Sequence, residues 1–181
     1  MKFHKTKLMG LYIIELEPFQ DDRGEFYRVL CKNELNEIGH KKEIVQINFS
    51  KTLRKGAIRG MHFQYPPKSE IKIVKCLKGS IYDVAVDLRK NSPTLLQWHG
   101  EVLNTKNFKM IYIPEGFAHG FQALEDNVEV IYFVTEFYSP ESEGGVKYDD
   151  PIINIQWPLE VTLISQKDKN LKLLDNTFEG I

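Results

Sequence analysis

Short β-strand patterns recur along the chain, and their spacing constrains the fold more than any other feature of the sequence. Apolar and β-branched residues form runs at 11–16, 44–49, 71–77, 81–88, 110–113, 121–124 and 128–137. Turn-forming Gly, Pro and Asn residues separate these runs at intervals of roughly ten residues. Such a series is typical of an antiparallel sandwich or barrel rather than of a parallel sheet. The sequence therefore predicts an all-β fold.

Three local patterns add detail to this prediction. The turn Lys78-Gly79-Ser80 joins the runs 71–77 and 81–88, which predicts a β-hairpin. Residues 33–38 favour the only clear helix, and Gly39 provides its stop. Beyond Pro151, residues 152–157 form a core-like segment, and a more polar end follows from residue 165 to residue 170.

Composition limits the number of domains and the kinds of partner. The chain has 181 residues, of which 42% are hydrophobic, so we expect one domain, residues 1–181, with a full core. Its net charge of -1 gives no support to a nucleic-acid or membrane partner. No apolar run approaches the roughly 18 residues of a membrane span, and no signal segment follows Met1, so a cytoplasmic location is expected. Cys31 and Cys76 are too few for a disulfide framework.

A polar group of side chains interrupts the apolar stretch at residues 57–68. In an extended chain, alternate side chains share a face, so His62 and Gln64 point one way while Met61 and Phe63 point the other. Arg59 is always charged and requires an anion if it faces a cavity. The pattern predicts the wall of a binding pocket, although a lone His in a β-protein is more often structural.

Residues on three further strand segments suggest the same pocket. Gln46 and Asn48 share one face of a strand whose other face is apolar, which suits either a surface strand or the mouth of a barrel. Lys72 stands between two isoleucines, so it either reaches solvent or carries a functional charge. Tyr132 lies on the apolar face of the longest run, as a core residue or as a general acid.

A second His and a carboxylate complete the candidates that the residues alone suggest. His119 lies in a loop shaped by Pro114, Gly116 and Gly120, which can present an imidazole to a ligand. Asp168 is a candidate partner for His62, since a carboxylate fixes the tautomer of a His and raises its basicity. A base, a Lys and a Tyr in an enclosed site are what proton transfer beside a carbonyl group requires.

Several motifs in this order resemble the dTDP-4-dehydrorhamnose 3,5-epimerase family over nearly the whole chain, from about residue 10 to residue 170. They are Asp22-Arg23-Gly24-Glu25-Phe26, Arg59-Gly60-Met61-His62-Phe63-Gln64, the segment 83–89, Ser92-Pro93-Thr94, the segment 114–121, Asp149-Asp150-Pro151 and Lys167-Asp168. The resemblance implies a cupin-type jelly roll with one or two short helices. It also implies a homodimer that exchanges an N-terminal strand, and a site inside the barrel without metal or cofactor.

The resemblance also assigns roles to individual residues. It implies that His62 is the base, Asp168 its partner, Tyr132 the acid on the opposite face, and Lys72 a residue near the C4 oxygen of the substrate. It implies substrate contacts at Arg23, Arg28, Gln46, Asn48, Arg59, His119, Glu143 and Lys167, with Phe19 and Phe26 holding the base or the sugar. Arg28 stands where the family usually has a Glu that contacts the nucleotide, and Phe133 follows the Tyr where the family usually has Lys.

The expected substrate is a nucleotide-diphospho-sugar with a ketone at C4. A proton on a carbon beside a ketone is weakly acidic because its loss gives an enolate, and a His base, a cationic Lys and a Tyr acid suit its removal and return. C3 and C5 both flank C4, so one ketone can serve two inversions. We therefore expect conversion of dTDP-4-dehydro-6-deoxyglucose to dTDP-4-dehydrorhamnose.

Three alternatives remain from the sequence. The first is an epimerase of C3 or C5 alone, or one that acts on another nucleotide-linked 4-keto-sugar. The second is a metal-dependent cupin, which is disfavoured because Gln64 stands where a second His ligand is needed. The third is a cupin that binds a sugar or nucleotide without catalysis, which has no need of His62, Lys72 and Tyr132 together.

Overall fold

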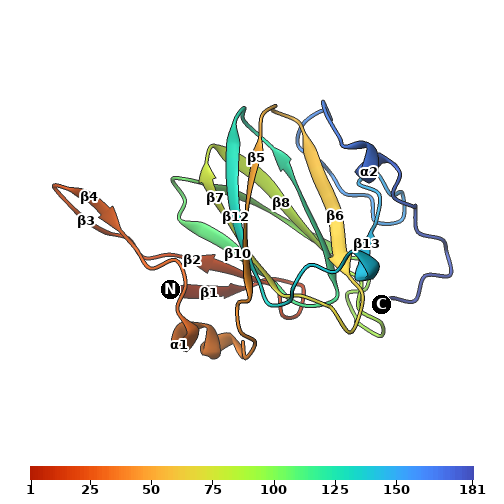
Figure 1. The fold of residues 1–181 in the computed structure, drawn as a ribbon, viewed down its shortest axis with the longest axis horizontal. Coiled ribbons are helices and arrows are strands. Elements are labelled where there is room, and N and C mark those ends of the chain that lie inside the picture. The colour runs from red at the N-terminus through yellow and green to blue at the C-terminus, as the bar shows by residue number, and fades with distance from the viewer.

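Two antiparallel β-sheets packed face to face form the body of the molecule (Figure 1), in a computed structural model that describes residues 1–181. The larger sheet has six strands in the order β1 (Lys2–Lys5), β2 (Tyr12–Glu15), β10 (Lys109–Ile113), β7 (Lys72–Lys78), β12 (Val128–Val134) and β5 (Gln46–Thr52). The smaller sheet has the order β13 (Glu143–Gly145), β6 (Ile58–Gln64), β11 (Phe117–Ala123), β8 (Ser80–Asp87) and β9 (Trp98–Asn104). The predicted all-β jelly roll is confirmed.

The predicted hairpin between residues 71–77 and 81–88 is wrong. Strand β7 pairs with β10 and β12 in the larger sheet, whereas β8 pairs with β11 and β9 in the smaller one. The chain changes sheets at Gly79, where φ is +74° and an added Cβ would lie 2.8 Å from Val128. A sharp turn between two strand patterns is therefore a corner between sheets here, and local sequence does not distinguish the two cases.

Three apolar clusters hold these layers together. The largest fills the space between the two sheets, with Val74 from one sheet and Ala85 from the other fully buried. A second covers the outside of the smaller sheet, where Ile153 and Ile155 of the predicted core-like segment pack without forming a strand. The third covers part of the outside of the larger sheet beneath the first helical segment. Burial of each large apolar side chain contributes about 1.5–3 kcal/mol.

The predicted helix is present as a short α1 (Lys32–Leu35) followed by a 3-10 turn, η1 (Asn36–Ile38). Gly39 ends it with φ +78°, as predicted. A further 3-10 turn is η2 (Pro140–Ser142), and α2 (Gln166–Lys169) lies in the segment predicted only as polar. Ser165 caps α2 by accepting a hydrogen bond from the backbone N–H of Asp168. No helix of the structure is long and apolar enough to span a bilayer.

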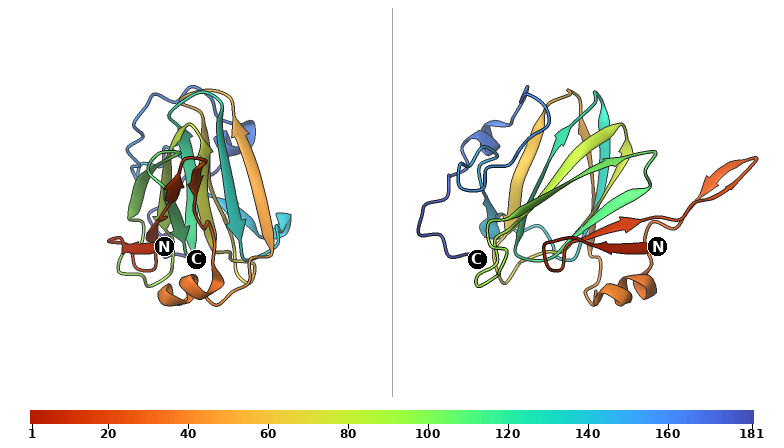
Figure 2. Two further views of the ribbon diagram at one scale, coloured as in Figure 1. Left: turned by 90° about the vertical axis from the view of Figure 1, so that its left-hand side faces the viewer. Right: turned by 180° about the vertical axis from the view of Figure 1, so that it is seen from behind.

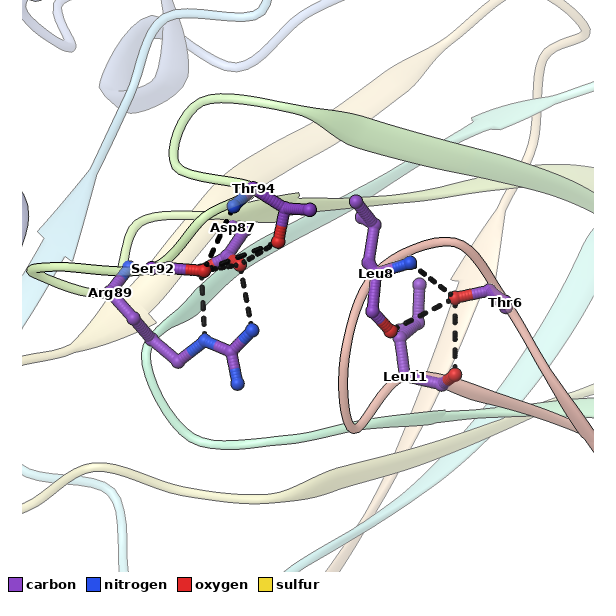
Figure 3. A network of polar contacts seen from close by, with 7 residues as sticks. All are labelled: Thr6, Leu8, Leu11, Asp87, Arg89, Ser92 and Thr94. Atoms are coloured by element: carbon purple, nitrogen blue, oxygen red, sulfur yellow. Dashed lines mark hydrogen bonds and ion pairs between the residues drawn. The ribbon is translucent and has the colours of Figure 1, made fainter.

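A buried carboxylate fixes the loop after β8 (Figure 3). Asp87 is fully buried and accepts hydrogen bonds from Arg89, Ser92 and Thr94, the Arg89 contact being bidentate at 2.9 and 2.7 Å. Beside this network, the Thr6 hydroxyl bonds to the backbone of Leu8 and Leu11 and closes the turn between β1 and β2. Both networks serve turns rather than the cavity described below.

A two-stranded hairpin projects from the body and pairs with no other strand (Figures 1 and 2). It consists of β3 (Phe19–Asp21) and β4 (Gly24–Phe26). Its aromatic residues are largely exposed, at 66% for Phe19 and 75% for Phe26. Strands β1 and β2, in contrast, pair within their own chain. Within this chain, the hairpin is therefore the one pair of strands that extends neither of the two main sheets.

Candidate active site

A cavity of about 610 Å³ lies between the sheets, with β5 and β12 of the larger sheet on one side and β6 and β11 of the smaller sheet on the other. A second, smaller cavity of about 270 Å³ adjoins it. His62, Lys72 and Tyr132 line both cavities and therefore stand where the two meet. The strand alternation predicted for β6, β7 and β12 is what turns these three side chains inward.

His62 and Asp168 form the closest pair in this cavity. The Nε2 atom of His62 lies 2.7 Å from Oδ1 of Asp168, and the backbone N–H of Gly60 donates to Oδ2 at 3.3 Å. A carboxylate accepts from an N–H, so Nε2 carries the hydrogen and Nδ1 is left free as a base. Burial raises the pKa of the Asp168 carboxyl, but these hydrogen bonds outweigh it, and the net pKa lies below its ordinary value of 3.8. The carboxylate therefore stays charged.

Lys72 and Tyr132 face His62 from the larger sheet. Nζ of Lys72 is 3.0 Å from Oε1 of Glu70, and it donates to the backbone oxygen of His62 at 3.3 Å. Burial raises the pKa of Tyr132, and the negative charge of Glu70 raises it further. The phenol consequently keeps its proton and can serve as an acid. His62 and Tyr132 thus approach the cavity from opposite sheets.

A second His–carboxylate pair lies beside the first. His119 on β11 is the register partner of His62 on β6. Its Nε2 lies 3.0 and 2.9 Å from the two oxygens of Asp83, which is fully buried on β8. This contact turns the other ring nitrogen of His119 toward the same cavity. The sequence singled out His119, but it gave Asp83 no role.

The remaining polar residues form the walls of the cavities. Gln46 donates to Asn48 at 3.0 Å on the inward face of β5, while Val45, Ile47 and Phe49 point outward, as the alternation predicts. Lys167 on α2 lies 2.6 Å from both carboxylate oxygens of Glu143, so the two residues bridge β13 and the C-terminal segment. The charge of Lys167 acts against the effect of burial on Glu143 and leaves the pKa of that carboxyl below its ordinary value.

Arg59 crosses from β6 to β5 at the mouth of the larger cavity. Its Nε donates to Oγ1 of Thr52 at 2.9 Å, and a terminal nitrogen donates to the backbone oxygen of Lys51 at 3.0 Å. No carboxylate forms an ion pair with the Arg59 guanidinium. Its charge is therefore available to an anion that enters the cavity.

Comparison with known proteins agrees with this geometry. A sequence model described as dTDP-4-dehydrorhamnose 3,5-epimerase matches residues 5–176. The chain belongs to the dTDP-4-dehydrorhamnose 3,5-epimerase family. The curated enzyme of that name from Methanothermobacter thermautotrophicus is 47% identical over 96% of this chain and 94% of its own.

Solved structures of family members superpose closely on this chain. The dTDP-4-dehydrorhamnose 3,5-epimerase of Bacillus anthracis, solved with TDP and PPi bound, gives a TM-score of 0.93 at 40% identity, covering 96% of this chain and 99% of the other. The Legionella pneumophila dTDP-6-deoxy-D-glucose-3,5-epimerase, solved with dTDP-4-keto-L-rhamnose, gives 0.90 at 40% identity, covering 95% and 92%. This chain thus shares its fold with both of these epimerases.

Four residues expected to contact an epimerase substrate lie outside the cavity of their own chain. Phe19, Arg23 and Phe26 belong to the projecting hairpin, where Arg23 pairs with Asp21 at 2.5 Å. Arg28, which replaces the usual Glu of the epimerase family, pairs with Glu34 at 2.6 Å beside α1. Within one chain, the structure does not bring these residues to His62.

Three residues that sequence reasoning missed also face the epimerase cavities. They are Glu70 beside Lys72, Tyr138, whose hydroxyl donates to Glu143 at 3.0 Å, and Ser50, whose buried hydroxyl has no hydrogen-bond partner. Ser50 continues the inward alternation of Gln46 and Asn48, so the pattern itself could have indicated it. Glu70 and Tyr138 lie in loops, where alternation gives no signal. No group of three or more His, Cys, Asp or Glu side chains is arranged to hold a metal.

Proposed function

We propose that this protein inverts C3 and C5 of dTDP-4-dehydro-6-deoxyglucose to give dTDP-4-dehydrorhamnose. One observation carries the proposal: a His–carboxylate base from one sheet faces a protonated Tyr and a Lys from the other across one cavity. Inversion requires a base and an acid on opposite sides of the reacting carbon. Family membership and the names of relatives support the choice of substrate.

The proposed reaction moves one proton at a time. Nδ1 of His62 removes the proton from the carbon beside the ketone, and the electron pair moves onto the C4 oxygen to form an enolate. The Lys72 ammonium stabilises that oxygen, a contribution of about 3 kcal/mol for a well-placed donor. Tyr132 then gives its proton to the opposite face of the same carbon. Solvent restores the phenol and removes the proton from His62, and the cycle repeats at the second carbon.

The charged residues around the cavity are the proposed contacts of the rest of the substrate. Arg59 and Lys167 supply cations for the diphosphate, and His119, Gln46, Asn48 and Glu143 supply hydrogen bonds to the sugar and nucleotide. Lys167 already pairs with Glu143, so binding of a diphosphate would exchange one anion for another at this Lys. The cytoplasmic location expected from the sequence stays a prediction.

We also propose a homodimer in which each hairpin β3–β4 reaches the cavity of the partner. Two features support it. The hairpin leaves Phe19 and Phe26 largely exposed. In addition, β5 at the edge of the larger sheet exposes Ile47 and Phe49 by 58% and 60%, which is unusual for large apolar side chains on neighbouring positions of one face. Exchange of the hairpin would bring Arg23 to a substrate that its own chain does not reach.

The decisive experiment is solvent deuterium incorporation. The protein is incubated with dTDP-4-dehydro-6-deoxyglucose in heavy water, and C3 and C5 are followed by NMR. We expect deuterium at both carbons together with inversion at both. Exchange and inversion at a single carbon would replace the proposal with a mono-epimerase. If neither carbon takes up deuterium, the proposed function is wrong for this substrate. The 4-keto-sugars linked to other nucleotides would then be tested, because Arg28 replaces the usual Glu.

A further inference from the structure

Glu70 is a carboxylate in the cavity region that the proposed reaction does not use. It lies in the loop between β6 and β7 and lines the smaller cavity with His62, Lys72 and Tyr132. Its side chain is only 12% exposed, and Oε1 lies 3.0 Å from Nζ of Lys72, which is itself 10% exposed. Among the ion pairs of the structure, this is the only one that Lys72 makes.

The loop holds the Glu70 carboxylate in a defined place. On its N-terminal side, the Gln64 amide donates to the backbone oxygen of Lys68 at 2.8 Å, and the Ser69 hydroxyl donates to the backbone oxygen of Gln64. On its C-terminal side, the backbone N–H of Ile71 donates to the Thr135 hydroxyl at 2.9 Å. Both ends of the short segment are therefore anchored to strands that carry catalytic candidates.

A buried ammonium is costly unless a carboxylate lies beside it. Without Glu70, the only contact of Lys72 would be the backbone oxygen of His62. A Lys side chain has four rotatable bonds, so an unpaired Nζ would turn toward solvent. The contact with Glu70 selects one direction for the Nζ of Lys72.

We propose that Glu70 is a positioning residue for the proposed epimerase reaction, which holds the Lys72 ammonium toward the enolate oxygen and places its own negative charge in the same cavity as Tyr132. This inference rests on the proposed function. The proposed proton transfers do not involve Glu70. It acts through the two side chains on either side of it.

The effect on Tyr132 can be compared with that of the other charged groups around the phenol. Burial is the largest cause of the raised pKa of Tyr132, Glu70 is the second, and Arg59 on β6 acts in the opposite direction. Lys72 on β7, His62 on β6 and Glu143 on β13 also line the smaller cavity, and Lys167 on α2 pairs with Glu143. Removal of the Glu70 charge therefore lowers the pKa of Tyr132, although burial still holds it above the ordinary value of 10.0.

The test compares Glu70→Gln, which keeps the shape and removes the charge, with Glu70→Asp, which keeps the charge. For Glu70→Gln we expect kcat to fall about 10- to 100-fold, as for loss of a preorganised group, with KM changed by less than about threefold. The alkaline limb of the pH profile of kcat should move to lower pH, because Tyr132 then ionises more easily. Glu70→Asp should restore the position of the limb at least in part.

Glu136→Gln is the matched control. Glu136 also pairs with a Lys, at 3.4 Å from Nζ of Lys68, but it lines neither cavity. Its replacement should leave kcat and the pH profile unchanged. If Glu70→Gln alters KM alone, or lowers kcat without moving the alkaline limb, the proposal is wrong. Circular dichroism and dTDP affinity show whether the variant is folded.

A readout that does not require turnover separates this inference from the proposed function. The titration of Tyr132 can be followed by NMR of ¹³Cζ-labelled tyrosine, with Tyr132→Phe used to assign the signal. We expect a lower titration midpoint in Glu70→Gln than in the wild type and in Glu136→Gln. Inactivity of the wild type on every 4-keto-sugar would overturn the function but leave this shift in place, whereas an unchanged midpoint would overturn the inference alone.

Discussion

Gly60 shows how one residue holds the candidate site together. It has φ +118°, and its backbone N–H donates to Asp168. An added Cβ would lie 2.6 Å from the Cα of Gly120 and 2.7 Å from the backbone oxygen of His119. No flexible side chain is available there to give way, so β6 and β11 would have to separate beside both histidines.

We therefore expect Gly60→Ala to destabilise the protein by about 3 kcal/mol or more, combining a strained φ with overpacking. Urea denaturation measures the change. Gly39→Ala is the control, because Gly39 also has a positive φ but nothing within 4 Å of an added Cβ. It should cost only about 1 kcal/mol. If both variants lose the same free energy of unfolding, backbone strain rather than the close approach of the strands accounts for the loss in Gly60→Ala.

Replacement of His62 and replacement of Tyr132 should affect deuterium exchange and inversion differently. Loss of the base in His62→Ala should stop deuterium exchange at both carbons, because no proton is removed. Loss of the acid in Tyr132→Phe should leave exchange in place and impair inversion, because the proton returns from the face that lost it. NMR in heavy water measures both properties in one sample. Loss of all exchange in Tyr132→Phe would contradict this division of roles.

At the scale of elements, His40 follows the α1–η1 segment and connects it to the larger sheet through a side-chain contact. It is 4% exposed, and its Nδ1 lies 3.1 Å from the hydroxyl of Tyr112 on β10. Burial lowers the pKa of His40 from its ordinary value of 6.5, and burial raises the pKa of Tyr112 to about 12. The native state consequently prefers a neutral His40.

This preference predicts a pH dependence of stability. As the pH falls below 6.5, the unfolded chain takes up a proton at His40 that the native state resists, so stability is lost until the pH passes the lowered native pKa. Urea midpoints measured on both sides of that window should fall more for the wild type than for His40→Gln. A parallel fall in both proteins would assign the effect to other groups.

The sequence predicted the faces of the strands better than their pairing. Alternation correctly placed Gln46 and Asn48 on one shared face, Tyr132 on the core face and Phe133 on the opposite face, because a strand has a fixed period of two. The turn pattern gave a wrong pairing at Gly79, because the same turn residues suit a hairpin and a corner between sheets. The contact of Asp168 with His62 was a candidate only, and Glu70 was missed, because neither carboxylate lies within a periodic strand pattern.

At the scale of the whole molecule, the projecting hairpin predicts that one active site needs two chains. A variant with a damaged hairpin, Arg23→Ala/Phe26→Ala, and a variant with a damaged cavity, His62→Ala, should each form little product. In a mixed dimer, the intact hairpin of one chain serves the intact cavity of the other. Random mixing gives half mixed dimers with one working site each, so product formation should recover to about a quarter of the wild type.

The control mixture pairs His62→Ala with Tyr132→Phe. Both variants carry cavity lesions and intact hairpins, so no mixed dimer contains a complete cavity, and inversion should not recover. If the hairpin and cavity variants also fail to complement each other, each site is served by its own chain. Sedimentation of the mixtures shows whether mixed dimers have formed.

The base and its carboxylate lie 106 residues apart along the chain, and this separation has a consequence for biosynthesis. At a translation rate of roughly 5–20 residues per second, His62 is added to the chain roughly 5–20 s before Asp168. A nascent chain can pair most of its strands in that time but still holds an imidazole with no fixed tautomer. Catalytic competence therefore arrives with the last part of the chain to be synthesised, and truncated products that fold would remain inactive.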